Sequence, residues 1–278
     1  MKTVGFIGLG VMGKLMAANV AKKFTVRSFD LNGKGNCRSA AQAAWGADVL
    51  ITMVPNTDDV RDAVLDAMPG LRPGAIVVDM SSADPAGTRA LGRVLAKNRI
   101  QMVDAPVSGA RFKAKDGTLA IMVGGDKASV AKVMPVLRTM GTEIFHCGPL
   151  GAGHAVKALN NYLGAAGTLA GFEALLVAQR FGLDPRPMID AINASTGRNS
   201  TTVRKIPQDI LTGAYASGFK LSLMTKDVGI AAQLAKGLGV NAPFLKETLK
   251  HWKAAQRQLT RDADHTEIYK YQKKLTRR

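Results

Sequence analysis

A glycine-rich loop near the start of the chain stands between an apolar segment and a segment suited to a helix. Residues 4–7 predict a buried strand, residues 8–13 (G-L-G-V-M-G) a tight turn, and residues 14–20 a helix. In such a unit Gly8 makes the turn, Gly10 lets the backbone approach a pyrophosphate, and Gly13 lets the helix pack on the strand. A glycine turn in another kind of α/β protein is the alternative. The loop predicts a dinucleotide site formed by Gly8, Leu9, Gly10, Val11, Met12 and Gly13.

Asp30 follows a second strand-like run, residues 24–29, and lies 22 residues after Gly8. An acidic side chain at this distance accepts a hydrogen bond from a ribose 2′-hydroxyl and repels a 2′-phosphate. We therefore expect Asp30 to contact the cofactor, and we expect NAD to be preferred over NADP.

Strand-sized apolar runs alternate with helical segments through residues 1–149, for example at 50–54, 75–79, 100–104 and 120–123. This alternation predicts an α/β fold with a Rossmann-type, mostly parallel, doubly wound sheet and ligands at the carboxyl ends of its strands. Only 17 residues separate Asp30 from Asp48, too few for a helix, a strand and a second helix. We expect a helix at residues 39–45 and no edge strand 3.

From residue 150 the pattern becomes helical, which predicts an all-α domain over residues 150–278 for substrate binding and dimerisation after a dinucleotide-binding domain over 1–149. Residues 153–181 contain no proline and predict one long helix. Small residues such as Gly164, Gly167 and Gly171 lie on more than one of its faces. Core packing alone is an alternative, but we expect this helix also to pack against a partner chain in a homo-oligomer, a dimer or tetramer.

The formal net charge of +17 favours anionic ligands, but the basic residues are scattered apart from a cluster at the C-terminus. With 5% aromatic residues the chain lacks the basic and aromatic interleaving that stacks bases, so we do not expect a nucleic-acid partner. No apolar stretch is long enough to cross a membrane. Cys37 and Cys147 form no metal or redox motif, so we expect no metal and a cytoplasmic location.

Residues 151–161 (G-A-G-H-A-V-K-A-L-N-N) place Lys157 and Asn161 four positions apart, on one face of a helix. Apolar neighbours would desolvate Lys157, and desolvation makes a lysine usable as an acid or base near neutral pH. A lysine whose stem covers apolar surface, beside a capping asparagine, is the structural alternative. For His154 we favour a packing or supporting role over a catalytic one, because Lys157 already fills the acid–base position.

Six segments, in order, resemble motifs of the β-hydroxyacid dehydrogenase family, which includes 3-hydroxyisobutyrate dehydrogenase and tartronate semialdehyde reductase. They are G-F-I-G-L-G-V-M-G (5–13), M-V-P (53–55), D-M-S-S (79–82), D-A-P-V-S-G-A (104–110), the segment 151–161, and Lys226-Asp227. The resemblance runs nearly from end to end of the chain. It implies an NAD(P)-dependent oxidoreductase with a 6-phosphogluconate dehydrogenase-like architecture that acts on a small anionic 3-hydroxy acid or its semialdehyde.

The resemblance also implies roles for individual residues. Lys157 would be the proton donor or acceptor, and Asn161 would hold the substrate. The Ser108 hydroxyl and the backbone N–H groups near Gly109 and Ala110 would hold a carboxylate. Further cofactor contacts would come from Met53, Val54, Pro55, Ser82 and Lys226.

One departure from the family pattern lies in the substrate motif, where Ala110 replaces a second glycine and adds a methyl group. Two alternatives to the dehydrogenase reading stay open. One is an imine reductase-like enzyme on the same scaffold, which shares the cofactor loop. The other is a non-catalytic relative that binds a nucleotide or nucleic acid, supported by the net charge alone.

Overall fold

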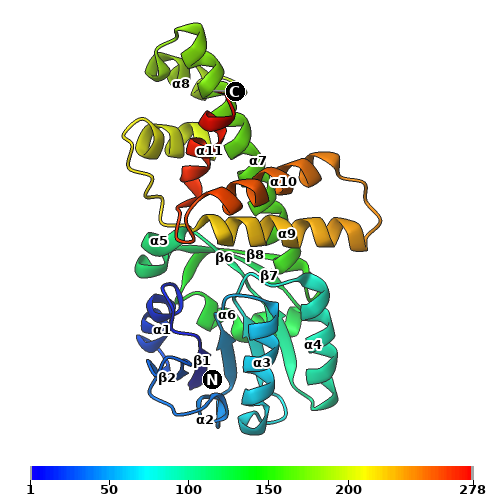
Figure 1. Cartoon of the computed structure of the whole chain (residues 1–278). Coiled ribbons are helices and arrows are strands. Elements are labelled where there is room, and N and C mark those ends of the chain that lie inside the picture. The colour runs from blue at the N-terminus through cyan, green and yellow to red at the C-terminus, as the bar shows by residue number, and fades with distance from the viewer. Residues whose placement is uncertain (1, 277–278) are drawn as a thin grey trace. The chain divides into compact units, whose positions relative to one another are not determined.

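A computed structural model describes residues 2–276 of the chain (Figure 1). The chain divides into two compact units, Met1–Lys157 and Ala158–Arg278. Within the described residues, no helix combines the length and apolar character needed to cross a membrane. Nor do three or more His, Cys, Asp or Glu side chains in that range converge in a way that could hold a metal ion.

The first unit contains the predicted α/β sheet, with strand order β2-β1-β3-β4-β5-β7-β6 and β8 paired to β7. The five strands from β2 to β5 are parallel, whereas β7 runs antiparallel to both β5 and β6. The elements in chain order are β1 (Thr3–Ile7), α1 (Gly13–Ala21), β2 (Thr25–Phe29), α2 (Ala40–Ala44), β3 (Val49–Thr52), α3 (Thr57–Ala67), the 3₁₀ turn η1 (Met68–Gly70), β4 (Ile76–Asp79), α4 (Pro85–Lys97), β5 (Gln101–Asp104), β6 (Val107–Ser108), α5 (Ala110–Asp116), β7 (Leu119–Gly124), α6 (Lys127–Leu137) and β8 (Gly141–Gly148).

Alternation of side chains along the strands builds one apolar core on each face of this sheet. In β3, for example, Val49 and Ile51 pack with α1 and α6, while Leu50 packs with α2, α3 and α4. Helices therefore cover both faces, as expected for a doubly wound sheet. This arrangement leaves the carboxyl ends of the parallel strands as the edge at which loops can hold a ligand.

The predicted absence of an edge strand after Asp30 is confirmed, because neither a strand nor a helix forms between β2 and α2. The side chain of Asn36 covers part of the exposed edge of β2 instead. It accepts a hydrogen bond from Ser28 N at 2.7 Å and donates one to Val26 O at 3.1 Å, and Cys37 N donates to Ser28 O. An open edge invites pairing with another chain, and these contacts satisfy part of it.

The second unit is helical, and the predicted helix at 153–181 is confirmed as α7 (Ala152–Phe181). An edge-to-face contact between Phe172 and Tyr269, with ring centroids 5.4 Å apart, joins α7 to the last helix within the core. The other elements are α8 (Pro185–Asn193), the π-helix η2 (Thr201–Ile210), α9 (Leu221–Gly237), α10 (Pro243–Gln258), the 3₁₀ turn η3 (His265–Glu267) and α11 (Ile268–Leu275).

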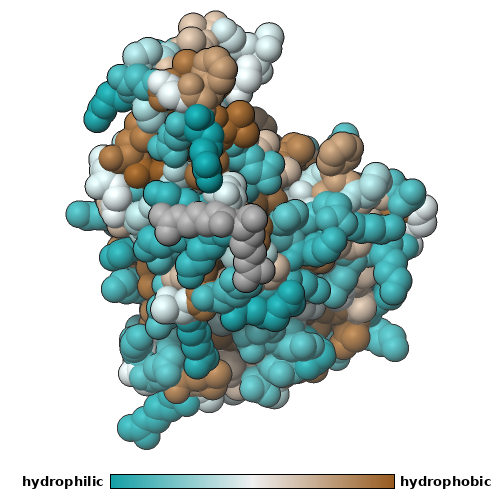
Figure 2. Space-filling view, turned by 45° about the horizontal axis from the view of Figure 1, so that its top comes forward, coloured by the Kyte–Doolittle hydropathy of each residue, from teal (hydrophilic) through white to brown (hydrophobic). Residues whose placement is uncertain are grey.

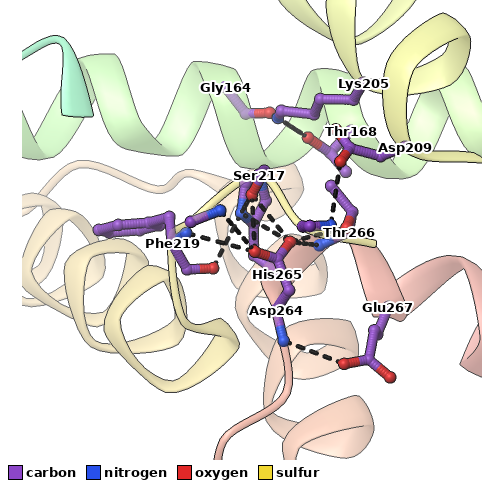
Figure 3. Close-up of polar contacts among 12 residues, drawn as sticks. Gly164, Thr168, Lys205, Asp209, Ser217, Phe219, Asp264, His265, Thr266 and Glu267 are labelled. Atoms are coloured by element: carbon purple, nitrogen blue, oxygen red, sulfur yellow. Dashed lines mark hydrogen bonds and ion pairs between the residues drawn. The ribbon is translucent and has the colours of Figure 1, made fainter. Parts of the chain in front are cut away.

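Asp264 is the centre of a polar cluster inside this helical unit (Figure 3). Its carboxylate accepts hydrogen bonds from Ser217 Oγ, Gly218 N and Thr266 N at 2.8–2.9 Å, and its own N–H donates to Glu267. These bonds cap η3 and tie it to the loop before α9. The carboxylate pKa is lowered, because the hydrogen bonds from Thr266 and Ser217 outweigh the effect of burial, which alone would raise it.

Two basic groups border this cluster, and both are held toward their uncharged forms. Burial and the charge of Lys205 lower the pKa of His265 to about 4. Burial and the charge of Arg204 lower the pKa of Lys205, whose Nζ lies 2.5 Å from Thr168 Oγ1, to about 8. The helical unit therefore contains a histidine that must stay neutral for the fold to be at its most stable.

Acid should destabilise the protein through His265. Between pH 6.5 and pH 4 the unfolded chain binds a proton at this residue that the folded chain does not, so stability falls as the pH falls. We expect a loss of roughly 2–3 kcal/mol over this window, measured by urea unfolding. The variant His265→Gln should lose less, whereas His251→Gln, at a half-buried position on α10, should follow the wild type. A His265→Gln variant with the full pH dependence would contradict this assignment.

Candidate active site

The three glycines of the first loop fall into two kinds of surroundings, crowded at Gly8 and Gly13 and open at Gly10. Gly8 has φ +94°, and a Cβ there would collide with the carbonyl of Met53. A Cβ at Gly13 would collide with the carbonyl of Gly8, whereas a Cβ at Gly10 would meet no atom within 4 Å. Gly8 and Gly13 thus serve packing, and Gly10 faces open space. A pyrophosphate approaching the backbone needs such a gap at the middle glycine, so this loop fits a dinucleotide.

The remaining residues of the loop divide between core and surface. Leu9 is buried, and Met12 packs partly on the core at the N-cap of α1, while Val11 is exposed. The exposed and small residues of the loop thus leave its backbone accessible, and the buried ones anchor it.

Asp30 lies directly after β2 and braces the glycine loop. Its carboxylate accepts hydrogen bonds from Leu9 N at 2.7 Å and from Asn32 N at 2.9 Å. Burial alone would raise the pKa of Asp30, but these two hydrogen bonds and the charge of Lys34 outweigh it, and the pKa is lowered. A fixed negative charge therefore stands beside the loop, where the ribose of a bound dinucleotide would be expected.

The loops after β3 and β4 lie side by side. Met53 N donates to Ile7 O at 2.9 Å, and Val54 N donates to Ser81 Oγ at 3.0 Å. Pro55 is exposed and Ser82 is half-buried in these same loops. Because β3 lies between β1 and β4 in the sheet, the loop after β3 lies next to the glycine loop on one side and next to the loop after β4 on the other.

The substrate motif lies at the junction of β6 and α5. Ser108 ends β6 and pairs with Ala120 of β7, and it is followed by Gly109 with φ +137° and Ala110 with φ +55°. A non-glycine residue in the left-handed region is strained, so Ala110 adopts the φ of this turn at an energetic cost. Asn19 of α1 donates to Ala114 O at 2.8 Å, which holds α5 against α1.

Lys157 and Asn161 lie one turn apart on α7, as predicted. Lys157 is half-buried. Asn161 is buried and donates from Nδ2 to Asp227 Oδ2 at 2.6 Å, while Lys226 Nζ lies 3.2 Å from Asp227 Oδ1. Asp227 thus fixes the orientation of the Asn161 amide: one of the two Nδ2–H groups donates to Asp227, and Oδ1 accepts a hydrogen bond from Asn160 Nδ2 at 3.2 Å. Asp227 was not predicted as a site residue, although its place in the K-D pair was a signal for it.

Two further buried carboxylates were missed by the sequence reasoning, which noted Asp79 and Asp104 only as motif letters. Asp104 ends β5 and accepts hydrogen bonds from Gly151 N and His154 N, both at 2.7 Å, so it caps the start of α7.

A hollow of about 850 Å³ in the unit Met1–Lys157 lies between α4 and the loop after β7. Its lining contains none of the residues predicted for the site.

Comparison with known proteins identifies relatives over almost the whole chain. Residues 3–148 match the family described as the NAD binding domain of 6-phosphogluconate dehydrogenase. Residues 151–272 match the family described as NAD-binding of NADP-dependent 3-hydroxyisobutyrate dehydrogenase.

Individual relatives agree with these families. A 2-(hydroxymethyl)glutarate dehydrogenase of Eubacterium barkeri is 38% identical over 87% of this chain and 85% of its own. An NAD-dependent L-serine dehydrogenase of Pseudomonas aeruginosa is 32% identical over 97% of both chains. The structure of a Mycobacterium tuberculosis 3-hydroxyisobutyrate dehydrogenase with L-serine superposes with a TM-score of 0.91 and 31% identity, covering 98% of this chain and 99% of that one.

Imine reductases share the fold but stand farther away. A Streptomyces aurantiacus imine reductase superposes with a TM-score of 0.63 at 19% identity, covering 100% of both chains. A likeness at this level shows a common fold and does not favour imine reduction.

The strain at Ala110 can be measured. Replacing Ala110 by glycine removes the clash of Cβ in the left-handed region, so we expect unfolding stability to rise by about 0.5–1 kcal/mol. Thermal and urea unfolding would measure this gain. As a matched control, Ala131→Gly at an exposed interior position of α6 should lower stability by about 0.5–1 kcal/mol. Equal losses at both positions would show that Ala110 is not strained.

Proposed function

The chain belongs to the β-hydroxyacid dehydrogenase family, and from this membership we propose that it transfers a hydride between NAD and a small 3-hydroxy acid or the matching semialdehyde. Its family makes it an NAD(P)-dependent hydroxyacid oxidoreductase. The observation that carries the finer proposal is the Lys157–Asn161 pair on α7, with the Asn161 amide held by Asp227 at 2.6 Å. An intact acid–base lysine beside an oriented amide argues for a working enzyme and against a non-catalytic relative.

The substrate class follows from the names of the relatives and from the turn after β6. Serine, 3-hydroxyisobutyrate and 2-(hydroxymethyl)glutarate each carry a CH₂OH group on the α-carbon, the carbon that bears the carboxylate. The hydroxyl group is therefore on the third carbon counted from the carboxylate, so each is a 3-hydroxy acid. We propose that the Ser108 hydroxyl and the N–H groups of Gly109 and Ala110 hold the carboxylate. The positive net charge favours the approach of such anions.

The chemistry divides between the cofactor and the chain. A bound nicotinamide would supply the redox chemistry, the acceptance or return of the hydride of the substrate carbon that carries the hydroxyl group. Lys157 takes the hydroxyl proton on its Nζ during oxidation and returns it during reduction. Asn161 hydrogen-bonds the substrate oxygen and keeps it within reach of Lys157. A pair on successive turns of one helix keeps a constant spacing, which favours the near-attack geometry.

For the cofactor we propose NAD in preference to NADP. Asp30 keeps its negative charge, and a 2′-phosphate placed beside it would be repelled. Gly8–Gly13 would hold the pyrophosphate at the N-terminus of α1. Met53, Val54, Pro55, Ser82 and Lys226 would surround the rest of the cofactor. Residues 1–149 then form the dinucleotide-binding domain, and residues 150–278 form the helical domain for substrate binding and dimerisation.

An apolar stripe on α7 supports a homo-oligomer, as a dimer or tetramer. Its members recur at helical spacing and carry no charge, although the exposed Glu173 borders them: Leu159, Leu163, Ala166, Ala170, Val177 and Phe181. Leu163 is 68% exposed and Phe181 is 81% exposed, although a surface helix normally turns a polar face to water. Figure 2 shows apolar side chains gathered in several groups in its upper part, between polar ones. A second copy of the chain would cover this stripe through a two-fold interface.

We place the enzyme in the cytoplasm. Cys37 and Cys147 both carry free thiols, as is usual in a reducing compartment.

Lys157 is tested by the variant Lys157→Met. Loss of the acid–base group should lower kcat by about 10²–10⁴-fold for 3-hydroxy acids such as 3-hydroxyisobutyrate or serine. The dissociation constant for NAD, measured by fluorescence titration, should change little. The control Lys132→Met, at an exposed position on α6, should keep the wild-type rate. A Lys157→Met enzyme that retains most of its kcat would exclude this lysine from the chemistry.

Asp30 is tested by the ratio of kcat/KM for NAD and NADP, which should favour NAD. Asp30→Asn keeps an acceptor for Leu9 N but removes the charge, so this ratio should fall roughly tenfold or more. Asp66→Asn, at an exposed position on α3, should leave the ratio unchanged. A wild-type preference for NADP would refute the assignment.

Leu163→Glu tests the interface, because a charge in the middle of a buried stripe is unfavourable. Light scattering should show a dimer or tetramer for the wild type and a smaller species for the variant at micromolar concentration. Leu65→Glu, at a partly exposed position on α3, should keep the wild-type mass. A monomeric wild type would disprove the proposal.

A further inference from the structure

Three buried ionisable side chains lie beneath the start of α7 and take no part in the chemistry proposed above. Asp79 and Asp104 are fully buried, His154 is 1% exposed, and all three belong to the unit Met1–Lys157. Asp79 and Asp104 end neighbouring strands and stand opposite each other in the register of β4 and β5. Buried charges are costly unless hydrogen bonds or opposite charges compensate them, so the arrangement around them is under strong constraint.

Asp104 is compensated by the backbone of α7. Both of its oxygens accept hydrogen bonds from N–H groups at the helix start, Gly151 N and His154 N. The partial positive charge at a helix N-terminus also favours a carboxylate there. A Cβ at Gly153 would collide with the carbonyl of Met122, so this glycine lets the first turn lie directly on the sheet. Asp104 thus fixes where the helix begins.

In the described part of the chain, only one of the two carboxylate oxygens of Asp79 accepts hydrogen bonds. Its Oδ1 accepts hydrogen bonds from Thr52 Oγ1 at 2.9 Å and from Ser81 N at 3.0 Å. Among the described residues its Oδ2 has no hydrogen-bond partner within normal geometry, and the same holds for His154 Nε2. These two atoms face each other at 3.5 Å.

The ring of His154 is oriented by a hydroxyl group on its other side. Thr88 Oγ1 on α4 lies 2.8 Å from Nδ1 and 3.0 Å from the carbonyl of Asp84. If Thr88 Oγ1 donates its proton to Nδ1, the neutral ring carries its own proton on Nε2; if Thr88 donates to Asp84 O, the ring proton lies on Nδ1. We favour the first arrangement, because Nε2 lies 3.5 Å from Asp79 Oδ2, whereas Nδ1 lies farther, 3.7 Å, from Asp104 Oδ2. In the second arrangement a lone pair on Nε2 would face the Asp79 carboxylate in a fully buried site. An Nε2–H group turned toward Asp79 Oδ2 makes each of these two atoms the nearest polar counterpart of the other, at 3.5 Å, which is longer than a normal hydrogen bond.

We propose that the 3.5 Å contact between His154 Nε2 and Asp79 Oδ2 closes to a hydrogen bond from Nε2–H, and that His154 is thereby a positioning residue for Lys157. Lys157 follows one turn later on the same face of α7, so the rotation of the first turn sets the direction of its side chain. Asp79 also accepts hydrogen bonds from Thr52, the residue before Met53, and from Ser81, the residue before Ser82. One buried carboxylate thereby aligns the helix of the acid–base lysine with the two loops. The consequence for catalysis rests on the proposed function, whereas the hydrogen bond does not.

The hydrogen bond is tested on the free protein by nitrogen-15 NMR of the histidine rings. The chain has four histidines, so His154 can be assigned by comparison with the variant His154→Gln. We expect the tautomer of His154 that carries its proton on Nε2. A ring with its proton on Nδ1 and a bare Nε2 would overturn the proposal, whatever the activity of the enzyme.

The positioning role is tested by kinetics. His154→Leu removes the donor, and a misplaced Lys157 should lower kcat by about 10–100-fold while KM for the hydroxy acid changes by less than about threefold. In His154→Gln an amide N–H can reach Asp79, so kcat should recover to within a few fold of the wild type. Leu95→Ala, a truncation in the core beneath α4, should lower Tm without this loss of kcat.

The NMR experiment tests the hydrogen bond of His154, and the kinetic experiments test its effect on Lys157. If His154→Leu keeps its kcat within twofold, His154 does not position Lys157. Should that variant fail to fold, Thr88→Val decides instead: it frees Nδ1, and a kcat reduced severalfold is expected, with an unchanged kcat as the contrary result. If the wild type oxidises no 3-hydroxy acid, the proposed function fails while the NMR result still stands.

Discussion

Two carboxylates at the ends of neighbouring strands organise this protein. Asp79 and Asp104 stand opposite each other where β4 and β5 end, and both are fully buried. A buried carboxylate is costly unless hydrogen bonds compensate its charge, so the groups that donate those bonds have fixed positions. Asp104 captures the first N–H groups of α7, and Asp79 captures Thr52 and Ser81. These hydrogen bonds hold the loops after β3 and β4 and the start of α7 at the carboxyl ends of the parallel strands.

Side chains also replace missing backbone partners at β2, the edge strand, after which the chain continues to α2 without forming another strand. With no strand beyond β2, the Asn36 side chain satisfies backbone groups of Val26 and Ser28 that a neighbouring strand would otherwise pair. Asp30, at the end of β2, holds Leu9 N and so ties the glycine loop to that strand. The fold tolerates the missing strand because it would lie at the edge, where it supports no further strand.

Patterns that depend on near neighbours in the chain could be predicted. The glycine loop, the helix of residues 153–181 and the missing edge strand were all expected and are confirmed. β8 and the antiparallel placement of β7 were not foreseen, because strand partners are chosen by contacts between distant segments. The four-residue spacing of Lys157 and Asn161 could be predicted from the sequence. Asp227, which orients the Asn161 amide, lies 66 residues away in the chain, and its role is evident only from the hydrogen bond in the structure.

By itself, the sequence determined the fold class, the position of the glycine loop and the family, because these follow from periodicity, glycine spacing and local motifs. The tertiary structure alone decided which polar groups compensate one another. It placed His154 Nε2 opposite Asp79 Oδ2, with Thr88 on the other side of the ring, although these residues lie 75 and 66 positions from His154. No local pattern encodes such a pairing: it arises when burial removes water and each remaining donor must find an acceptor within the packed core.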